Sequence, residues 1–270
     1  MIPLLRASHF QPTLAVTAIT TALAVAVGRG LGSIWVALAV FAGQLSVGWS
    51  NDYLDRGRDA TAGRTDKPIV SGRISARAVG VGAVAAVVVC VPLSFASGWR
   101  AALVHLVAVA SAWGYNARLK MLALSVLAYM AAFALLPAFV TLGLASHRWP
   151  PAWAMVAAAL LGAGAHFINT LADIDADAAT GVRGLPQRLG PERSLLMGTG
   201  LMAAATAVVV FAPAGGPDVL VSVLAVGALI AVVGVVVVAR AGHDRAAWSL
   251  TLCTAGLAVA VFLANGSALT

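Results

Sequence analysis

The chain has 270 residues, of which 61% are hydrophobic and only 10% are charged, and its mean hydropathy is +0.94. A water-facing surface needs about a quarter of charged residues, so this composition excludes an ordinary soluble enzyme and indicates a polytopic membrane protein. The formal net charge of +7 comes from basic residues scattered over short loops rather than gathered in one stripe, which argues against nucleic acid as a partner.

Breaks between the apolar runs predict nine membrane-spanning helices, because a spanning helix needs about 20 predominantly apolar residues. In chain order the expected spans are roughly 12–28, 33–51, 77–97, 101–116, 121–145, 151–173, 193–212, 218–239 and 246–266. The predicted fold is therefore all-α, with one domain over residues 1–270 whose nine helices surround a central cavity in the lipid bilayer. A short internal repeat, described below, predicts related halves of roughly 1–120 and 121–270.

The basic residues predict the orientation of these spans. With the N-terminus inside, 14 of the 17 Lys and Arg residues fall in cytoplasmic loops, leaving outside only Arg29, Arg100 and Arg148. The positive-inside rule therefore places the N-terminus in the cytoplasm and, for an odd number of spans, the C-terminus outside. We expect a multi-pass protein of the cell (plasma) membrane.

Two polar segments interrupt the apolar pattern at the cytoplasmic ends of the second and sixth predicted spans. "NDYLDRGRDATAGRTDKP" begins at Asn51 and "NTLADIDADAATGVRGLP" begins at Asn169, and the two align without gaps. Each contains an Asn and two Asp residues spaced by four, and such side chains lie within roughly 80° of one another on a helix. The sequence predicts two facing stripes, formed by Asn51, Asp55 and Asp59 and by Asn169, Asp173 and Asp177.

Most of the acidic residues belong to these two segments: seven of the ten are Asp52, Asp55, Asp59, Asp66, Asp173, Asp175 and Asp177. Carboxylates gathered in this way repel one another unless a cation neutralises them. Oxygen ligands without His or Cys favour a hard ion, and Mg²⁺ typically binds one or two carboxylates, waters and phosphate oxygens. The pattern therefore indicates a Mg²⁺-bridged diphosphate, although each Asp taken alone is also typical of a solvated loop.

Other polar residues flank the stripes. Gln44 and His166 extend them into the membrane, and together with Asn169 they are possible cavity residues, although a lone buried His is more often a satisfied polar group between helices. Positive-inside loops account for most of the nearby basic residues. An anionic leaving group needs cations beyond the metal, however, and Lys67, Lys120 and Arg183 each lie just beyond a polar motif.

Taken together, these motifs resemble the UbiA-type membrane prenyltransferase superfamily. The resemblance runs in order from residue 4 to about residue 190 and is carried by "LLRASHFQPT", "NDYLDRGRD", "YNARLK", "NTLADIDAD" and "GVRGLPQRLG". It implies an intramembrane enzyme that binds an isoprenyl diphosphate through Mg²⁺ and transfers the isoprenyl group to a small, commonly aromatic, acceptor. The implied metal and diphosphate ligands are Asn51, Asp55, Asp59, Asp173 and Asp177, the four aspartates being catalytic, and the implied diphosphate contacts are Lys67, Tyr115, Lys120 and Arg183.

Departures from the family pattern leave the acceptor open. Lys67-Pro68 stands where the family often has Arg-Pro, Thr170 stands where many relatives have Asp, and "RLKMLALS" lacks an Asn-containing patch seen in several. A UbiA-type terpene cyclase, which uses the prenyl diphosphate alone, is therefore an alternative. A divalent cation transporter is a more remote one, because transport sites usually lie near the bilayer midplane on broken helices. Prenyl chain length and oligomeric state stay open.

Overall fold

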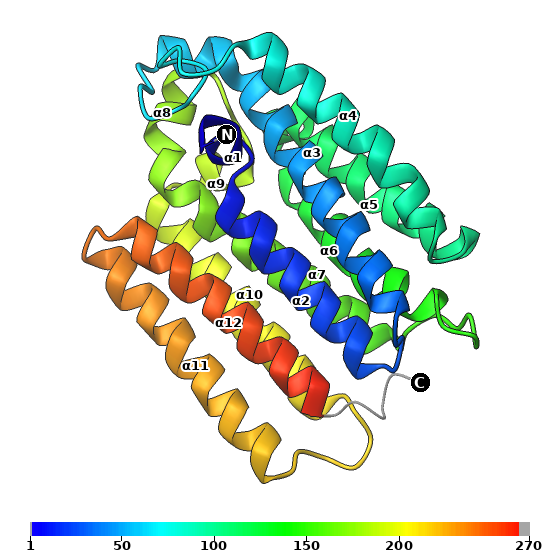
Figure 1. The fold of residues 1–270 in the computed structure, drawn as a ribbon. Coiled ribbons are helices and arrows are strands. Elements are labelled where there is room, and N and C mark those ends of the chain that lie inside the picture. Colours follow the sequence, from blue (N-terminus) through cyan, green and yellow to red (C-terminus); the bar gives the residue numbers. More distant parts are fainter. Residues whose placement is uncertain (1, 265–270) are drawn as a thin grey trace.

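A computed structural model of the chain describes residues 2–264 and, within them, every side chain except those of residues 2, 175, 176 and 244. Over this range the chain is helical and contains no strand. Long helices run side by side in one bundle, and short helices and loops gather at one of its ends (Figure 1). The long helices are α2 (Phe10–Ala26), α3 (Gly32–Thr61), α4 (Ala76–Phe95), α5 (Trp99–Ala117), α6 (Ser125–Leu142), α7 (Ala152–Thr170), α10 (Pro191–Phe211), α11 (Val219–Arg240) and α12 (Asp244–Ala264).

The long helices form a closed ring. Neighbours in the chain pack against each other from α2 to α7, α10 packs on α7, and α12 returns to contact α2. The short elements are α1 (Ile2–Ala7), η1 (Leu119–Met121), η2 (Leu171–Asp173), α8 (Ile174–Ala179) and α9 (Leu185–Leu189). Helix α1 lies at the end of the bundle that carries α8 and α9, whereas α12 ends at the opposite end (Figure 1). The proposed division into halves near residue 120 falls at η1 and stays a prediction.

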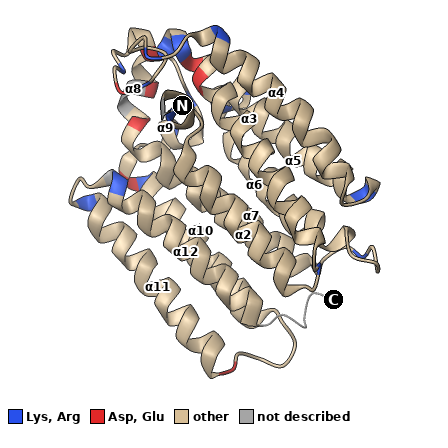
Figure 2. Cartoon of the chain, in the orientation of Figure 1, with Lys and Arg blue, Asp and Glu red and all other residues tan. Residues whose placement is uncertain are grey.

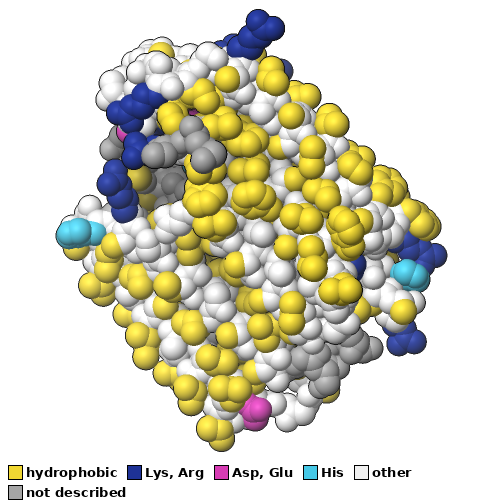
Figure 3. All heavy atoms as spheres, in the orientation of Figure 1, with side chains coloured by type: hydrophobic (Ala, Val, Ile, Leu, Met, Phe, Trp, Pro, Cys, Tyr) yellow, Lys and Arg dark blue, Asp and Glu magenta, His cyan; other side chains and the backbone are white. Residues whose placement is uncertain are grey.

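The helices have the length and surface of membrane spans. Each of the nine predicted spans coincides with a long helix. Within the described residues, seven helices are long and apolar enough to cross a membrane; α2 is shorter, at 17 residues, and α5 is not among the seven. The chain is a multi-pass membrane protein, but the count of nine stays a prediction. Hydrophobic side chains are spread over much of the face shown in Figure 3, as contact with lipid requires.

Helix α3 extends well beyond the predicted span, which ended at residue 51. Its 30 residues reach roughly 45 Å at about 1.5 Å per residue, whereas the hydrocarbon core is about 30 Å thick. No Gly or Pro in a breaking position interrupts "SNDYLDRGRDAT", so the helix continues past the bilayer to Thr61. The first Asp stripe therefore lies on a continuous helix, as the sequence predicts.

The second stripe differs from the prediction of one continuous helix. Helix α7 ends at Thr170, the three residues of η2 follow as a tighter turn, and α8 begins at Ile174. Thr170 turns its hydroxyl back to the His166 carbonyl, at 3.1 Å, and to the Phe167 carbonyl, at 3.0 Å. Such bonds compete with the regular backbone ladder and bend helices. Asp173 is thus the last residue of the tight turn and not part of an unbroken α-helical face.

Glycine permits close packing at two places that fix the site. At Gly164 an added Cβ would lie 2.8 Å from the Gly198 carbonyl oxygen, so α7 and α10 approach closely where α7 leads to the second Asp stripe. At Gly48 an added Cβ would overlap the Ser8 carbonyl oxygen, because the turn between α1 and α2 rests directly on α3. Trp49 Nε1 strengthens that contact by donating to the Leu4 carbonyl oxygen at 2.8 Å.

We expect Gly48→Ala to lower the stability of the protein in detergent by about 1–3 kcal/mol, the usual cost of overpacking. The Cβ has no free space, because the atoms that it meets are backbone atoms. Thermal unfolding of Gly57→Ala is the matched control. Gly57 lies on the same helix with open space around it, and Ala stabilises a helix interior by about 1 kcal/mol over Gly. Equal melting temperatures for the two variants would contradict the packing.

Candidate active site

Charged residues concentrate at the end of the bundle that carries α1, α8 and α9 (Figure 2). Both Asp stripes lie there, on α3 and on the η2–α8 segment, together with the loop that joins α3 to α4. The opposite end carries few charges. The distribution places the two predicted stripes at a common end of the molecule.

Asp55 is the centre of the first stripe. Its Oδ1 accepts hydrogen bonds from Lys120 Nζ and from Arg58 Nη2, and Asn51 Nδ2 lies 3.3 Å from its Oδ2. Asn116, which is buried, holds Asn51 in place, with 3.2 Å between the Asn51 amide nitrogen and the Asn116 amide oxygen. Helix α5 ends at Ala117, so η1 can turn Lys120 inward. Burial lowers the pKa of Lys120, and the Asp55 carboxylate opposes that effect.

Asp59, one turn further along α3, differs from Asp55 in its partners. It is half-buried, and no ion pair or hydrogen bond of its carboxylate occurs among the described residues. Lys67 and Arg64 are near enough to attract its charge, whereas Asp55 and Asp52 repel it. Asp59 is therefore a carboxylate that faces the site without a cation of its own.

Lys67 has another partner than the sequence suggests. Its Nζ lies 2.7 Å from Oδ1 of Asp52, which is only 2% exposed, and His9 Nε2 lies 3.2 Å from the same oxygen. Asp52 is thus a structural anion that anchors the turn before α2 and the α3–α4 loop on α3. Lys67 contributes positive charge beside Asp59, but its ammonium group forms an ion pair with Asp52.

Arg64 ties the second stripe to the loop between α3 and α4. Arg64 Nη1 lies 2.7 Å from Asp173 Oδ1, and its other nitrogens bind Asp66 at 3.0 and 3.1 Å. Asp177 accepts a hydrogen bond of 2.8 Å from Gln187 Nε2. Burial, reinforced by the negative charge of Asp173, raises the pKa of Asp177. Asp175 lies outside the described side chains.

Arg183 does not enter this network. It is exposed, and its side chain pairs with none of the acidic side chains that the structure describes. Its backbone carbonyl oxygen accepts a hydrogen bond of 2.8 Å from Arg188 Nε. Arg183 therefore lies in solvent, and its contact with a diphosphate stays a prediction.

An aromatic cluster closes the site toward the membrane. The Tyr115 ring meets Tyr129 edge-on at 4.9 Å between centroids and His166 at 5.3 Å, and both Asp55 and Asp177 act electrostatically on Tyr115. Asn169, the first residue of the second stripe, is exposed. Tyr115 thus lies near enough to one aspartate of each stripe to be affected by its charge, and its contact with a diphosphate stays a prediction.

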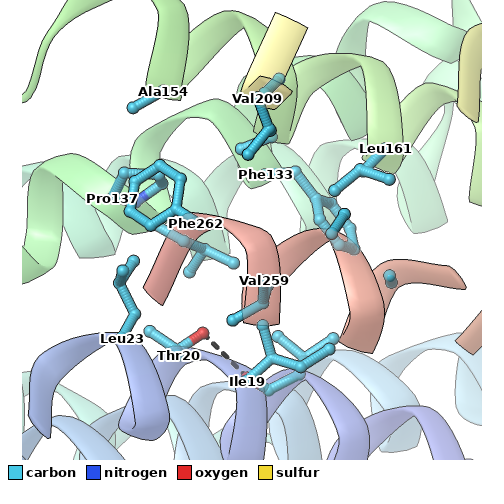
Figure 4. A pocket seen from close by; sticks show the side chains of 16 residues that line it. Ile19, Thr20, Leu23, Phe133, Pro137, Ala154, Leu161, Val209, Val259 and Phe262 are labelled. Atoms are coloured by element: carbon cyan, nitrogen blue, oxygen red, sulfur yellow. Dashed lines mark hydrogen bonds between the residues drawn. The ribbon is translucent and has the colours of Figure 1, made fainter. Parts of the chain in front are cut away.

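An apolar cavity lies beneath the aromatic cluster, between α2, α6, α7, α10 and α12 (Figure 4). The volume open to the centres of water-sized spheres is about 90 Å³, and Thr20 supplies the one polar side chain in a wall of aliphatic and aromatic residues. Phe133 joins cluster and cavity, because it stacks on Tyr129 at 6.2 Å and also lines the cavity. Gln44, His166 and Asn169, the predicted cavity residues, do not line this space.

The donor chemistry of the stripes fits a hard divalent cation. Asp59 pairs with no cation among the described side chains, Asp177 accepts a hydrogen bond from a neutral amide, and the remaining predicted ligands are oxygen donors too. The described residues do not contain a ready cluster of three or more His, Cys, Asp or Glu side chains around one point. A metal that keeps waters and takes phosphate oxygens, as Mg²⁺ does, suits this partial set better than one that needs a full protein cage.

The comparisons with known proteins agree with this arrangement. Residues 13–265 match the model of the UbiA prenyltransferase family. The chain belongs to the UbiA prenyltransferase family. The resemblance seen in the sequence is thereby confirmed, and the protein is a prenyltransferase by family. A search of curated proteins gives no significant match.

Solved UbiA homologs share the fold over almost the whole chain. The apo homolog from Aeropyrum pernix K1 is 21% identical, with a TM-score of 0.75 over 94% of this chain and 98% of that chain. The homolog from Archaeoglobus fulgidus, solved with GPP and Mg²⁺, is 20% identical, with a TM-score of 0.72 over 98% of both chains. A structure of digeranylgeranylglyceryl phosphate synthase is 15% identical, with a TM-score of 0.65, and covers 98% of this chain and 97% of that chain.

Several residues of this UbiA site were not singled out from the sequence. Arg58 and Arg64 pair with Asp55 and Asp173, Asn116 holds Asn51, and Gln187 binds Asp177. For Arg58 a signal existed, because it lies three residues after Asp55 on a helix, where opposite charges meet. Arg64 and Asn116 make contacts between distant segments, and Gln187 reaches Asp177 from ten residues further along the chain, so the spacing within a helix predicts none of these three.

Proposed function

We propose that this UbiA protein catalyses the Mg²⁺-dependent transfer of an isoprenyl group from a prenyl diphosphate to a small aromatic acceptor. The observation that carries the proposal is the convergence of two Asp stripes and several cations directly above an aromatic cluster and an apolar cavity. The polar part suits a diphosphate, and the apolar part suits its hydrocarbon tail. Basic residues around the stripes favour a site that opens to the cytoplasm.

The ligands for the metal would be Asn51, Asp55, Asp59, Asp173 and Asp177. Bound Mg²⁺ would supply positive charge to the leaving diphosphate. In the free protein, Asp55 is paired with Lys120 and Arg58, and Asp173 is paired with Arg64. Once the carboxylates turn to the metal, the three cations are free to bind diphosphate oxygens, and the Tyr115 hydroxyl borders the same space. Lys67 and Arg183 add positive charge at the rim.

Heterolysis is the first chemical step in this scheme. The C–O bond breaks, its electron pair leaves with the diphosphate, and the allylic carbon becomes electron-deficient. Tyr115 and Tyr129 offer aromatic faces to that positive charge, and the apolar cavity around Phe133 and Leu161 holds the tail away from water. The acceptor carbon then forms the new bond and gives up its proton to solvent.

Removal of the metal tests the function. Purified protein in lipid nanodiscs is incubated with radiolabelled geranyl diphosphate, with and without phenolic acceptors, in Mg²⁺ or in EDTA. We expect diphosphate release and a prenylated aromatic product in Mg²⁺, and at least a 100-fold loss in EDTA, because a metal supplies several kcal/mol of charge stabilisation. A cyclised terpene formed without acceptor would assign a cyclase. Mg²⁺ flux across vesicles without diphosphate release would assign a transporter.

A further inference from the structure

His166 carries a polar atom that the fold leaves unused. The residue is 1% exposed, and its Nε2 lies 3.2 Å from the Ser125 hydroxyl oxygen. Its Nδ1 is buried and has no hydrogen-bond partner among the described residues. A buried polar atom without a partner destabilises the protein, so its presence calls for a reason, and a role in binding is a common one.

The hydrogen bonds of Ser125 determine which ring nitrogen carries the proton. The Ser125 hydroxyl oxygen accepts a hydrogen bond of 3.1 Å from the backbone N–H of Leu185. Among the described residues the partner left for the Ser125 proton is His166 Nε2, and the arrangement that satisfies the hydroxyl has this nitrogen as the acceptor. In a neutral imidazole the remaining proton is on Nδ1. The unused atom is therefore a hydrogen-bond donor, and the group that it lacks is an acceptor oxygen.

The position of the ring relates this donor to the reaction. His166 stacks on Tyr129 at 4.6 Å and meets the edge of Tyr115 at 5.3 Å. Tyr115 is the ring on which both Asp55 and Asp177 act, and Tyr129 continues through Phe133 to the apolar cavity. The imidazole thus lies one aromatic ring away from the proposed diphosphate site, at the boundary between diphosphate and tail. The reacting allylic carbon belongs at this boundary.

We propose that His166 binds the acceptor by donating its Nδ1–H to an oxygen of a phenolic substrate. This inference deepens the proposed function and rests on it. The acceptor class follows from the chemistry of the donor, because an N–H seeks a hydroxyl, phenolate or carbonyl oxygen next to the ring that is prenylated. A site built around such a bond discriminates strongly against an analogue that lacks the oxygen.

A matched pair of substitutions separates the two ring nitrogens. The amide of Asn occupies the place of Nδ1 but is too short to reach Ser125, whereas the amide of Gln reaches Ser125 and leaves the Nδ1 place empty. With 2-naphthol as the acceptor probe and geranyl diphosphate as donor, we expect His166→Gln to lower kcat/KM for 2-naphthol about 100-fold, as loss of one aimed donor does. His166→Asn is expected to stay within about threefold of the wild type, and KM for geranyl diphosphate is expected to be unchanged in both.

His105→Gln is the control, since His105 is 2% exposed, stacks on Phe139 at 4.4 Å and bonds the Ser94 hydroxyl at 2.8 Å, away from the Asp stripes. The His105→Gln variant should bind 2-naphthol as the wild type does. Should His166→Gln not fold, the ¹⁵N resonance of Nδ1 in histidine-labelled wild type must shift when 2-naphthol is added.

Three results would overturn the assignment: equal kinetics of the Gln and Asn variants, an unmoved Nδ1 resonance, or a wild type that binds geranyl diphosphate with Mg²⁺ but not 2-naphthol. Each of them leaves the proposed function standing. Absence of Mg²⁺-dependent geranyl diphosphate binding would instead remove the proposed function itself, and the acceptor assignment with it.

Discussion

Asp59→Asn is expected to reduce diphosphate release about 1,000-fold, or roughly 4 kcal/mol in transition-state stabilisation, without lowering the melting temperature. The carboxylate has no ion pair or hydrogen bond among the described residues, so the folded protein loses no contact when the charge is removed. Asp55 and Asp52 repel it in the free protein. Its charge is useful only when a metal is present. Activity and stability should therefore respond in different ways.

Asp66→Asn is the matched control for this prediction. Asp66 is also an aspartate of the first segment, but its side chain is 60% exposed and binds Arg64. The hydrogen bond from Arg64 lowers the pKa of Asp66, so the group is charged at neutral pH in the free protein as well. We expect its substitution to change diphosphate release by less than about threefold, since exposed ion pairs contribute little. An Asp59 variant that keeps more than a tenth of wild-type activity would exclude this carboxylate as a metal ligand.

The helical fold follows directly from the sequence, because runs of apolar residues of bilayer length have few alternatives in lipid. The breaks between runs predicted each long helix to within a few residues at most ends. The exceptions have local causes. Helix α3 continues to Thr61 because polar residues also form helices, and α6 begins at Ser125 because η1 takes up the preceding residues. Hydropathy reports where lipid ends and not where a helix ends.

The site was predictable in its composition but not in its pairings. The repeated Asn-x3-Asp-x3-Asp spacing singled out Asp55, Asp59, Asp173 and Asp177, which the structure places on α3, η2 and α8. It could not show that Asp55 is paired with Lys120, whereas the carboxylate of Asp59 has no ion pair with any side chain that the structure describes. Pairing depends on how α3, η1 and the α3–α4 loop pack in three dimensions.

Lys67 illustrates the same limit. Its place after the first motif suggests a diphosphate contact, and that role stays a prediction. In the structure its ammonium group lies on Asp52, an acid one residue off the stripe. Positive-inside loops supply many cations near the membrane surface, so sequence alone cannot assign each cation to its anion.

Lys120→Met is expected to have two opposite effects. Diphosphate release should fall about 100-fold, because a cation that stabilises the leaving group is lost. Binding of Mg²⁺ in the absence of prenyl diphosphate should become tighter, because the Lys120 ammonium competes with the metal for Asp55 Oδ1. Arg58 continues to neutralise Asp55, so the carboxylate is not left without a partner and the protein should fold. Tryptophan fluorescence titrated with Mg²⁺ measures the binding of the metal, and release of labelled diphosphate measures the turnover.

Arg118→Met removes a cation from the same turn and is the control, since Arg118 is exposed. It should change neither quantity by more than about twofold, as expected for an exposed charge. Lys120→Arg keeps the charge but replaces a compact ammonium by a planar fork, so we expect weak Mg²⁺ binding together with partial turnover. If Lys120→Met weakened Mg²⁺ binding and turnover together, Lys120 would be needed to position Asp55 and would not be a cation that moves from the carboxylate to the diphosphate.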